Sequence, residues 1–376
     1  MFYRQTRKSD INRPMLIIDM EQLKHRKILI NVVEKYFPRY ILDPSKINFG
    51  LGKRIFFMIF RFFIETLTKF LLKTPTNKVG VLDLQEVDEV YRREAKTYNN
   101  KHHLTTRGMD LVWRRNIGWF LAASNMGRTE PITVLDLCTG TGLTIKEICK
   151  ILDQWSIPAN LIGLDYNSEM LDIARSTIKT NSDYLINFVK GDAMDLVKND
   201  LKTRDGITQF ECNKFDYVVQ MFGIGGIDKP IKEFYDILQI LKPEGKFYLI
   251  DMHRPIPDLP GELPVLFKWL RFPSLEWFLY EKTTIPLVLN KLWGWRDTTL
   301  CFYFLNLVVY KDENQNYWAF EPIYFEYEPQ RWWLSFPLMP TGKLIVKKVR
   351  ITAEEAITRG LVLKSCKSSL MTTELV

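Results

Sequence analysis

The stretch VLDLCTGTGLT, residues 134–144, decides the fold of this chain. An apolar run with one aspartate leads into two glycines, Gly140 and Gly142, which are separated by a single threonine. Residues 132–137 predict a buried strand, and residues 143–152 have the periodicity of a helix. Glycine permits a tight turn between the two and lets a ligand approach the backbone without a Cβ in the way. We therefore expect a ligand-binding loop at the end of a buried strand.

The alternation of strand and helix continues downstream. Apolar runs predict further strands at residues 160–166, 186–192, 214–222 and 245–253, and helical periodicity is found at 167–178 and 228–241. Such alternation predicts an α/β fold with a doubly wound, mostly parallel sheet that is covered on both faces. Right-handed crossovers place the carboxyl ends of these strands at one edge of the sheet, where ligands of such folds bind.

Two aspartates lie at that edge beside the glycine loop. Asp165 ends the second predicted strand, where a carboxylate can accept hydrogen bonds from both hydroxyls of a ribose. Asp192 ends the third and could accept from the amino group of an adenine. Either aspartate alone could be a helix cap or a turn residue, but together with the glycines they favour a nucleoside ligand. A dinucleotide is disfavoured, because the third glycine of the G-x-G-x-x-G fingerprint is missing, and no P-loop lysine follows.

Five segments carry a family resemblance. VLDLCTGTG, LIGLDYNSEMLDIAR, VKGDAMDL, FDYVVQMFGI and LKPEGKFYLID resemble, in order and spacing, the nucleotide-binding core of class I S-adenosylmethionine-dependent methyltransferases. The resemblance implies a Rossmann-like fold and S-adenosylmethionine as the cofactor. The residues that it implies for cofactor binding are Asp136, Cys138, Thr139, Gly140, Gly142, Asp165, Tyr166, Asp192, Ala193 and Gln220, with Tyr98 and Arg114 from the segment upstream.

That upstream segment, VYRREAKTYNNKHHLTTRGMDLVWRR at residues 90–115, is similar to the N-terminal signature of the ubiquinone/menaquinone C-methyltransferase family. The matching residues are Tyr98, Gly108, Trp113 and Arg114, whereas Asn99, His102 and Thr106 replace the family's aspartate, asparagine and serine. By this resemblance the segment folds over the cofactor, with Tyr98 near its methionine end. A departure follows the fourth strand, where FGIGGI puts Gly225 and Gly226 in place of a polar pair that includes an arginine.

The first 80 residues carry the positive charge of the chain. They hold 16 Lys/Arg against 6 Asp/Glu, a balance of +10, which leaves −2 for the rest of a chain whose net charge is +8. Within them, RIFFMIFRFFIETLTKFLLK (54–73) predicts a helix with one narrow charged stripe and a wide apolar face. Such a helix could lie in a membrane interface beside anionic headgroups, or pack on the protein body; its charges argue against a membrane span. Nucleic acid is not expected as a partner, because no recognisable nucleic-acid-binding module accompanies the basic residues.

A second unusual region follows the predicted core. Seven of the ten tryptophans lie at or after Trp269, and residues 302–310 and 317–327 around the polar KDENQN predict a hairpin. This region could be an antiparallel extension of the core, or a lid that shapes an apolar pocket or meets a membrane. We expect four parts: a basic, partly helical N-terminal extension (1–80), a cofactor-binding core (81–254), an aromatic-rich antiparallel insertion (255–350), and a helix and strand that complete the core (351–376).

The cysteines and histidines of the chain limit the kinds of site that it can form. Five cysteines without a C-x-x-C pair suggest neither disulfides nor a zinc site, and no metal cluster is apparent among His25, His102, His103 and His253. No N-terminal segment has the pattern of a cleaved signal peptide, so we expect a cytoplasmic protein with peripheral membrane association. If the acceptor is a phenol or an activated ring carbon, a base must remove a proton, and the candidates are Tyr98, His102 and His253. For each histidine, a structural hydrogen-bonding role is the alternative.

These observations predict a methyltransferase for a hydrophobic, membrane-associated acceptor. The leading hypothesis is C- or O-methylation of a prenylated quinol-like ring. The alternatives are N-methylation of a lipid amine such as phosphatidylethanolamine, which would not need the missing arginine, and a non-catalytic assembly protein that keeps the fold. The sequence leaves the oligomeric state open.

Overall fold

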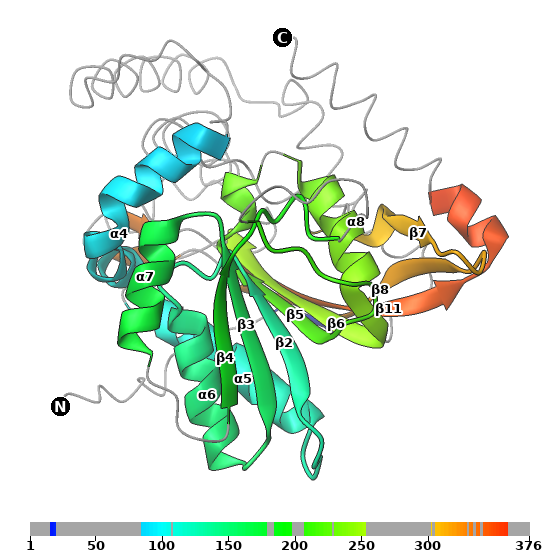
Figure 1. Cartoon of the computed structure of the whole chain (residues 1–376), viewed down its shortest axis with the longest axis horizontal. Coiled ribbons are helices and arrows are strands. Elements are labelled where there is room, and N and C mark those ends of the chain that lie inside the picture. The colour runs from blue at the N-terminus through cyan, green and yellow to red at the C-terminus, as the bar shows by residue number, and fades with distance from the viewer. Residues whose placement is uncertain are drawn as a thin grey trace, which may run out of the picture.

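A computed structural model describes residues 16–19, 84–106, 108–178, 184–197, 207–227, 229–252, 302, 305–328, 331–333, 336–338 and 341–359. Its central element is a nine-stranded sheet in the order β1-β8-β11-β6-β5-β2-β3-β4, with β7 paired to β8 (Figure 1). A separate two-stranded sheet pairs β9 (Arg331–Trp333) with β10 (Phe336–Leu338).

The five strands predicted for the core form the parallel half of the sheet. They are β2 (Ile132–Leu137), β3 (Ala159–Asp165), β4 (Tyr184–Lys190), β5 (Phe215–Met221) and β6 (Leu241–Met252). Neighbours among them all pair in parallel, which confirms the predicted α/β class. β2 lies between β3 and β5, so its carboxyl end is at the point where the strand order reverses, and ligands bind there in such sheets.

Five helices accompany these strands. They are α4 (Leu84–Thr106), α5 (Met109–Ser124), α6 (Leu143–Gln154), α7 (Ser168–Thr177) and α8 (Pro230–Ile240). The helices predicted after the first, second and fourth core strands are therefore confirmed as α6, α7 and α8. The side chain of Asn167 caps α7 by accepting a hydrogen bond from Met170 N, and Pro230 supplies a fixed φ at the first turn of α8.

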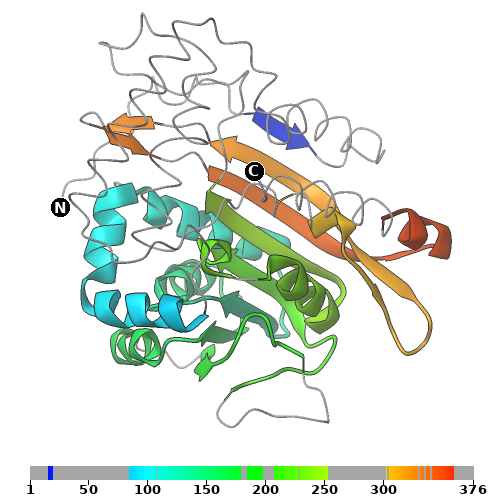
Figure 2. The same ribbon diagram turned by 90° about the horizontal axis from the view of Figure 1, so that it is seen from above.

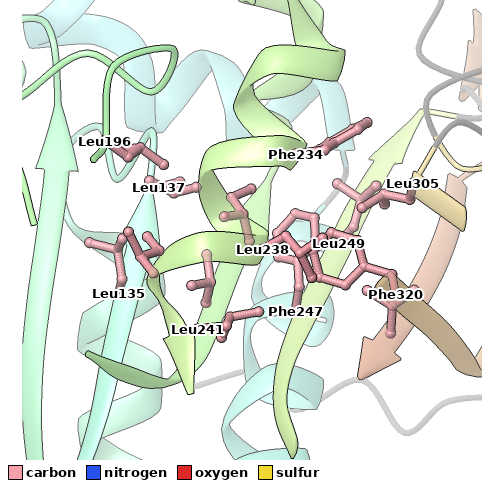
Figure 3. Packing of buried hydrophobic residues seen from close by; sticks show 14 of the residues in the cluster. Leu135, Leu137, Leu196, Phe234, Leu238, Leu241, Phe247, Leu249, Leu305 and Phe320 are labelled. Atoms are coloured by element: carbon pink, nitrogen blue, oxygen red, sulfur yellow. The ribbon is translucent and has the colours of Figure 1, made fainter. Parts of the chain in front are cut away.

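Two hydrophobic clusters lie on opposite faces of the sheet. On one face, Ile117 of α5 and Ile148 of α6 pack over Val134 and Val219. On the other, Phe234 of α8 packs with Leu137, Phe247 and Phe320, as Figure 3 shows. Because both faces are covered, the parallel strands read as continuous apolar runs, which is the pattern by which the sequence predicted them.

The region expected as an insertion supplies three strands of the main sheet, β7, β8 and β11. β11 (Thr341–Ile351) is antiparallel to β6, and β8 (Tyr317–Glu328) is antiparallel to β11, so β8 runs parallel to the core strands (Figure 2). The predicted hairpin is confirmed as β7 (Val309–Lys311) with β8, although β7 is shorter than expected. The boundary placed after residue 350 falls at the last residue of β11, so the strands of the insertion and of the core belong to one sheet. Without β11, the backbone groups of β6 would form an open edge.

The strand β11 was not predicted from the sequence because it contains buried lysines. Lys348 is 1% exposed, and its Nζ donates to Leu241 O at 2.7 Å and to Asn213 Oδ1 at 2.8 Å. Lys343 is also buried, and its Nζ lies 3.1 Å from Glu326 Oε2. A strand with lysines on both faces does not show the apolar run of a central strand, although these lysines are paired inside the protein.

One piece of the N-terminal extension belongs to the same sheet. β1 (Leu16–Asp19) pairs antiparallel with β8, so these residues form a strand rather than part of the expected helical extension. The predicted helix at 54–73 lies outside the described residues. In the part of the chain that the structure describes, no helix is long and apolar enough to cross a bilayer.

Candidate active site

The two glycines after β2 have different structural roles. Both have a left-handed backbone, with φ of 56° at Gly140 and 76° at Gly142. A Cβ on Gly140 would meet no described heavy atom within 4 Å, so space is left above the loop. A Cβ on Gly142 would lie 2.5 Å from Ile178 Cδ1 and 3.1 Å from Ala174 Cβ. Gly140 therefore leaves room for a ligand, and Gly142 allows close packing against the end of α7.

Asp165 ties the glycine loop to the end of β3. Its Oδ2 accepts a hydrogen bond from Gly140 N at 2.8 Å, and its Oδ1 accepts from Asn167 N at 2.9 Å. Burial raises the pKa of Asp165, while these backbone N–H groups oppose the shift. The half-buried carboxylate is thus positioned at the ligand edge by two different loops.

Asp136 lies beneath the loop and is 2% exposed. Its Oδ2 accepts a hydrogen bond from the Thr139 hydroxyl at 2.6 Å. Burial raises the pKa of Asp136 to about 7, although Thr139 and the charge of Arg114 act in the opposite direction. A carboxylate that ionises near neutral pH in this position costs stability in the absence of a cationic ligand.

We predict that Asp136→Asn stabilises the ligand-free protein at pH 8, on the order of 1–3 kcal/mol. The folded-state pKa is raised, so wild-type stability is lost as pH rises from about 4, where unfolded Asp136 ionises, to about 7. Urea unfolding at pH 5 and pH 8 measures the difference, which should be larger at pH 8. Asp153→Asn, an exposed change on α6, is the matched control. A variant no more stable than wild type at pH 8 would contradict the prediction.

The next polar residues come from the loop after β4 and the end of β5. Asp192 is 5% exposed, and its Oδ1 accepts from Met194 N at 2.9 Å; Ala193 beside it is buried. Gln220 is fully buried, with its Nε2 donating to Glu233 Oε1 at 2.7 Å and lying 3.6 Å from Cys138 Sγ. The structure thus brings together Gln220 of β5 and Cys138, the first residue after β2.

Glu233 was missed by sequence analysis. It lies on the buried side of α8, and burial raises its pKa well above the ordinary value, which keeps the carboxyl group neutral. Its signal was a charged residue directly before Phe234 and four residues before Ile237, both of which are apolar. Another predicted residue, Tyr166, is half-buried, and Lys190 Nζ lies 5.5 Å from its ring centroid.

Aromatic side chains from α4, from α5 and from the residue after β5 meet near the loop. The ring of His102 lies 5.4 Å from that of Tyr98 and 5.5 Å from that of Phe222, and the ring of Trp113 lies 5.3 Å from that of Phe222. Phe222, like Cys138 at the end of β2, has a left-handed backbone, with φ of 56°. Left-handed conformations of non-glycine residues are strained and gather at functional sites.

Arg114 connects this aromatic group to the first turn of α6. It is 5% exposed, its NH1 donates to the Thr144 hydroxyl at 2.6 Å, and its Nε lies 4.0 Å from Asp110 Oδ2. Nearby, the Thr141 hydroxyl of the glycine loop donates to Asn99 Oδ1 at 2.6 Å. Helix α4 therefore contacts the glycine loop directly, and α5 contacts the first turn of the helix that follows the loop.

Direct contacts join Asp136 to Thr139, Gly140 to Asp165, Cys138 to Gln220, and Tyr98 to His102, whereas Tyr166, Asp192 and Ala193 follow the neighbouring strands β3 and β4. His253 lies outside the described residues. No group of three His, Cys, Asp or Glu side chains in the described ranges could hold a metal ion. Where the family's polar pair was expected, residues Ile224–Gly226 form a short 3-10 helix, and Ile224 N donates to Asp251 Oδ2 at 3.2 Å.

Comparison with known proteins places this site in a family context. The profile of the ubiE/COQ5 methyltransferase family matches residues 79–261, slightly under half of the chain. A demethylmenaquinone methyltransferase of Lactobacillus johnsonii is 32% identical over 185 residues, which are 48% of this chain and 65% of that protein. The enzyme of the same name from Staphylococcus aureus MRSA252 is 25% identical over 187 residues, 50% of this chain and 68% of that one. The chain spans about two thirds of these relatives.

Among solved structures, phosphoethanolamine N-methyltransferase 1 of Haemonchus contortus, in complex with phosphoethanolamine and S-adenosylhomocysteine, has a TM-score of 0.45. It is 11% identical, and the match covers 77% of this chain and 56% of that one.

The family match identifies S-adenosylmethionine as the cofactor, and the site fits it. Open space lies over Gly140, and the carboxylate of Asp165 borders the loop at the edge where the strand order reverses. Asp192 lies at the same edge, one strand further out. Carboxylate acceptors beside an open glycine loop suit the hydroxyl and amino donors of a nucleoside.

Proposed function

We propose that this chain, a class I S-adenosylmethionine-dependent methyltransferase close to the ubiE/COQ5 family, methylates a hydrophobic quinol-like ring. The observation that carries the acceptor class is the aromatic group beside the loop, in which His102 lies between Tyr98 and Phe222. Flat aromatic faces around one imidazole suit an aromatic acceptor, because rings stack offset or edge to face. Two curated relatives are named for demethylmenaquinone, a compound of this class.

We propose the following roles for the cofactor residues. Asp165 would accept from the ribose hydroxyls, and Asp192 with Ala193 and Tyr166 would border the adenine. Gly140 and Gly142 would let the backbone approach the cofactor. The methionine end would be held by the group comprising Asp136, Cys138, Thr139, Gln220, Tyr98 and Arg114. The bound cofactor supplies an activated methyl group, so the chain's own task is to hold the acceptor in line and to take up its proton.

His102 is the base that we propose among the three candidates. Burial lowers the pKa of His102, so the imidazole is neutral near pH 7 and can accept a proton. Burial raises the pKa of Tyr98 to about 12, which leaves its hydroxyl protonated and suited to orienting the acceptor. His102 stands at the position where the family signature has asparagine. The segment FGIGGI lacks the arginine that the family has there, so His102 would supply the site with a base.

The proposal also assigns roles to the regions on either side of the cofactor-binding core. The residues between β6 and β8 would act as a lid over the acceptor. The basic N-terminal region, including 54–73, would bring the protein to the membrane surface where a prenylated acceptor resides. Residues 81–254 would bind the cofactor, with β8 and β11 as further strands of the same sheet.

The test is incubation of the purified protein with methyl-deuterated S-adenosylmethionine and a membrane-lipid extract, followed by mass spectrometry. We expect the deuterated methyl group on a ring fragment of a quinone-class lipid. The control reaction uses Asp165→Ala, which should transfer much less label. Label on an ethanolamine headgroup would replace the proposal by lipid amine N-methylation. Cofactor binding without a labelled lipid would move the search to soluble acceptors, and absence of cofactor binding would favour the non-catalytic alternative.

A further inference from the structure

The corner between α4 and α5 gathers polar side chains around one buried carboxylate. α4 ends at Thr106, and α5 begins at Met109. Gly108, at φ 76°, makes the turn, and its N–H donates to His103 O at 2.9 Å. The turn places Asp110, in the first turn of α5, against the last turn of α4.

Asp110 is 1% exposed and faces several partners there. The Thr106 hydroxyl donates to its Oδ1 at 3.0 Å, and His103 Nδ1 lies 3.5 Å from the same oxygen. Its Oδ2 lies 3.7 Å from His102 Nδ1 and 4.0 Å from Arg114 Nε. Asp110 is thus the only carboxylate recorded beside the His102 ring among the described residues.

The charge states of this pair suit a base and its orienting group. Burial alone would raise the pKa of Asp110, but His102, Arg114 and Thr106 together hold it at about 2, so the carboxylate stays charged. Burial lowers the pKa of His102, so the imidazole starts neutral, with a proton on one nitrogen only. A carboxylate beside one ring nitrogen selects the tautomer with the proton on that nitrogen.

We propose that Asp110 is a positioning residue that holds the Nδ1–H tautomer of His102, so that Nε2 is the nitrogen that takes the acceptor's proton. The proposal rests on the proposed function, because it concerns the base of that reaction. The distance of 3.7 Å is longer than a hydrogen bond, and catalytic contacts of this kind are often long before the acceptor binds. The arrangement follows the logic of a base oriented by a third group.

The proton and electron balance is complete. The acceptor's hydroxyl or ring C–H gives its proton to His102 Nε2 as its oxygen or carbon bonds the methyl carbon. The electron pair of the methyl–sulfur bond stays on sulfur, which becomes a neutral thioether. Asp110 remains ionised and stabilises the imidazolium that forms. No oxidant, reductant or further reactant is needed.

The alternative is a purely structural role. Asp110 lies in the first turn of a helix, where a negative charge is favourable, and it links α4 to α5 through Thr106. A structural carboxylate would stabilise the corner without setting the tautomer of His102 or the pH dependence of the reaction. Two measurements separate the two roles.

The first measurement needs no substitution at Asp110. The chain has four histidines, so nitrogen-15 labelling of histidine gives few imidazole signals, and the signals missing from His102→Asn assign His102. In the intact protein with S-adenosylhomocysteine, we expect His102 in the neutral Nδ1–H form. The Nε2–H form would overturn the proposal. This result does not depend on the identity of the acceptor, so it is separate from failure of the proposed function.

The second measurement is the pH profile of kcat for Asp110→Asn with a soluble short-chain quinol. We expect kcat to fall on the order of 10²-fold or more, because the amide neither selects the tautomer nor stabilises the imidazolium. The acid limb should move to lower pH, since removing a negative charge lowers the pKa of His102. Among the described residues, Arg114, His103 and Tyr98 are further titratable or charged groups that face His102, and Phe222, directly after β5, presents an apolar ring.

Controls make the outcome decisive. Asp172→Asn, an exposed carboxylate on α7, should leave kcat and the profile unchanged. The double variant His102→Asn/Asp110→Asn should be no slower than His102→Asn, because the two residues act as a unit. S-adenosylhomocysteine affinity should stay within about threefold of wild type. A drop in kcat with an unmoved acid limb, or additive losses in the double variant, would assign Asp110 a structural role.

Discussion

Gly142→Ala is expected to lower the free energy of unfolding by about 2–5 kcal/mol. The alanine would have to adopt φ of 76°, which costs roughly 1–2 kcal/mol for an L-residue. Its Cβ would also lie 2.5 Å from Ile178 Cδ1 and 3.1 Å from Ala174 Cβ, so these side chains must shift, and overpacking of this kind costs about 1–3 kcal/mol. Urea unfolding of the ligand-free protein measures the sum.

The matched control is Gly127→Ala. Gly127 has nearly the same backbone, φ 79°, but a Cβ there would meet no described atom within 4 Å. This variant should lose only the backbone part, roughly 1–2 kcal/mol. Equal losses in the two variants would mean that the packing at Gly142 relaxes freely, contrary to the argument.

Asp165→Ala is expected to weaken binding of S-adenosylhomocysteine by about 1–3 kcal/mol, a loss of roughly 5- to 150-fold in affinity. The substitution removes the carboxylate proposed to accept from the ribose. It also leaves Gly140 N and Asn167 N without their acceptor, so the glycine loop loses its tie to β3. Calorimetric titration of the folded variant gives the affinity directly.

The control is Asp172→Ala, which removes an exposed carboxylate further along α7. It should bind S-adenosylhomocysteine as wild type does. A folded Asp165→Ala protein with unchanged affinity would contradict the proposal that Asp165 binds the ribose. Asp165→Asn helps to separate the effects, because its amide oxygen can still accept from Gly140 N while the negative charge is lost.

The core of the fold could be predicted because its signals are local. Each parallel strand is an apolar run, and β2, β3 and β5 are each followed by a helix whose apolar residues recur at helical spacing. The handedness of the crossovers then puts Asp136, Asp165 and Asp192 at one edge without any knowledge of tertiary contacts. In the structure, Asp136 and Asp165 form hydrogen bonds with residues of the glycine loop, and Asp192 follows β4, one strand further out.

The features that could not be predicted from the sequence share one physical cause. β11, Glu233 and Asp110 all place charged or ionisable side chains inside the protein, where the sequence pattern predicts solvent exposure. For β11 and Glu233, burial is possible because partners come from other elements, as Leu241 O does for Lys348 and Gln220 for Glu233. The partners of Asp110 are close in the chain, but they meet it only because of the turn between α4 and α5. No periodicity within a segment reports such a partner.

By itself, therefore, the sequence determined the α/β class, the glycine loop, its aspartates and the methyltransferase resemblance, because each depends on residues close together in the chain. Only the tertiary structure decided that β8 and β11 complete the sheet. It also decided that Gly140 leaves space while Gly142 packs, and that Asp110 lies behind His102. These features depend on which side chains of different elements meet, and on how burial then shifts their ionisation.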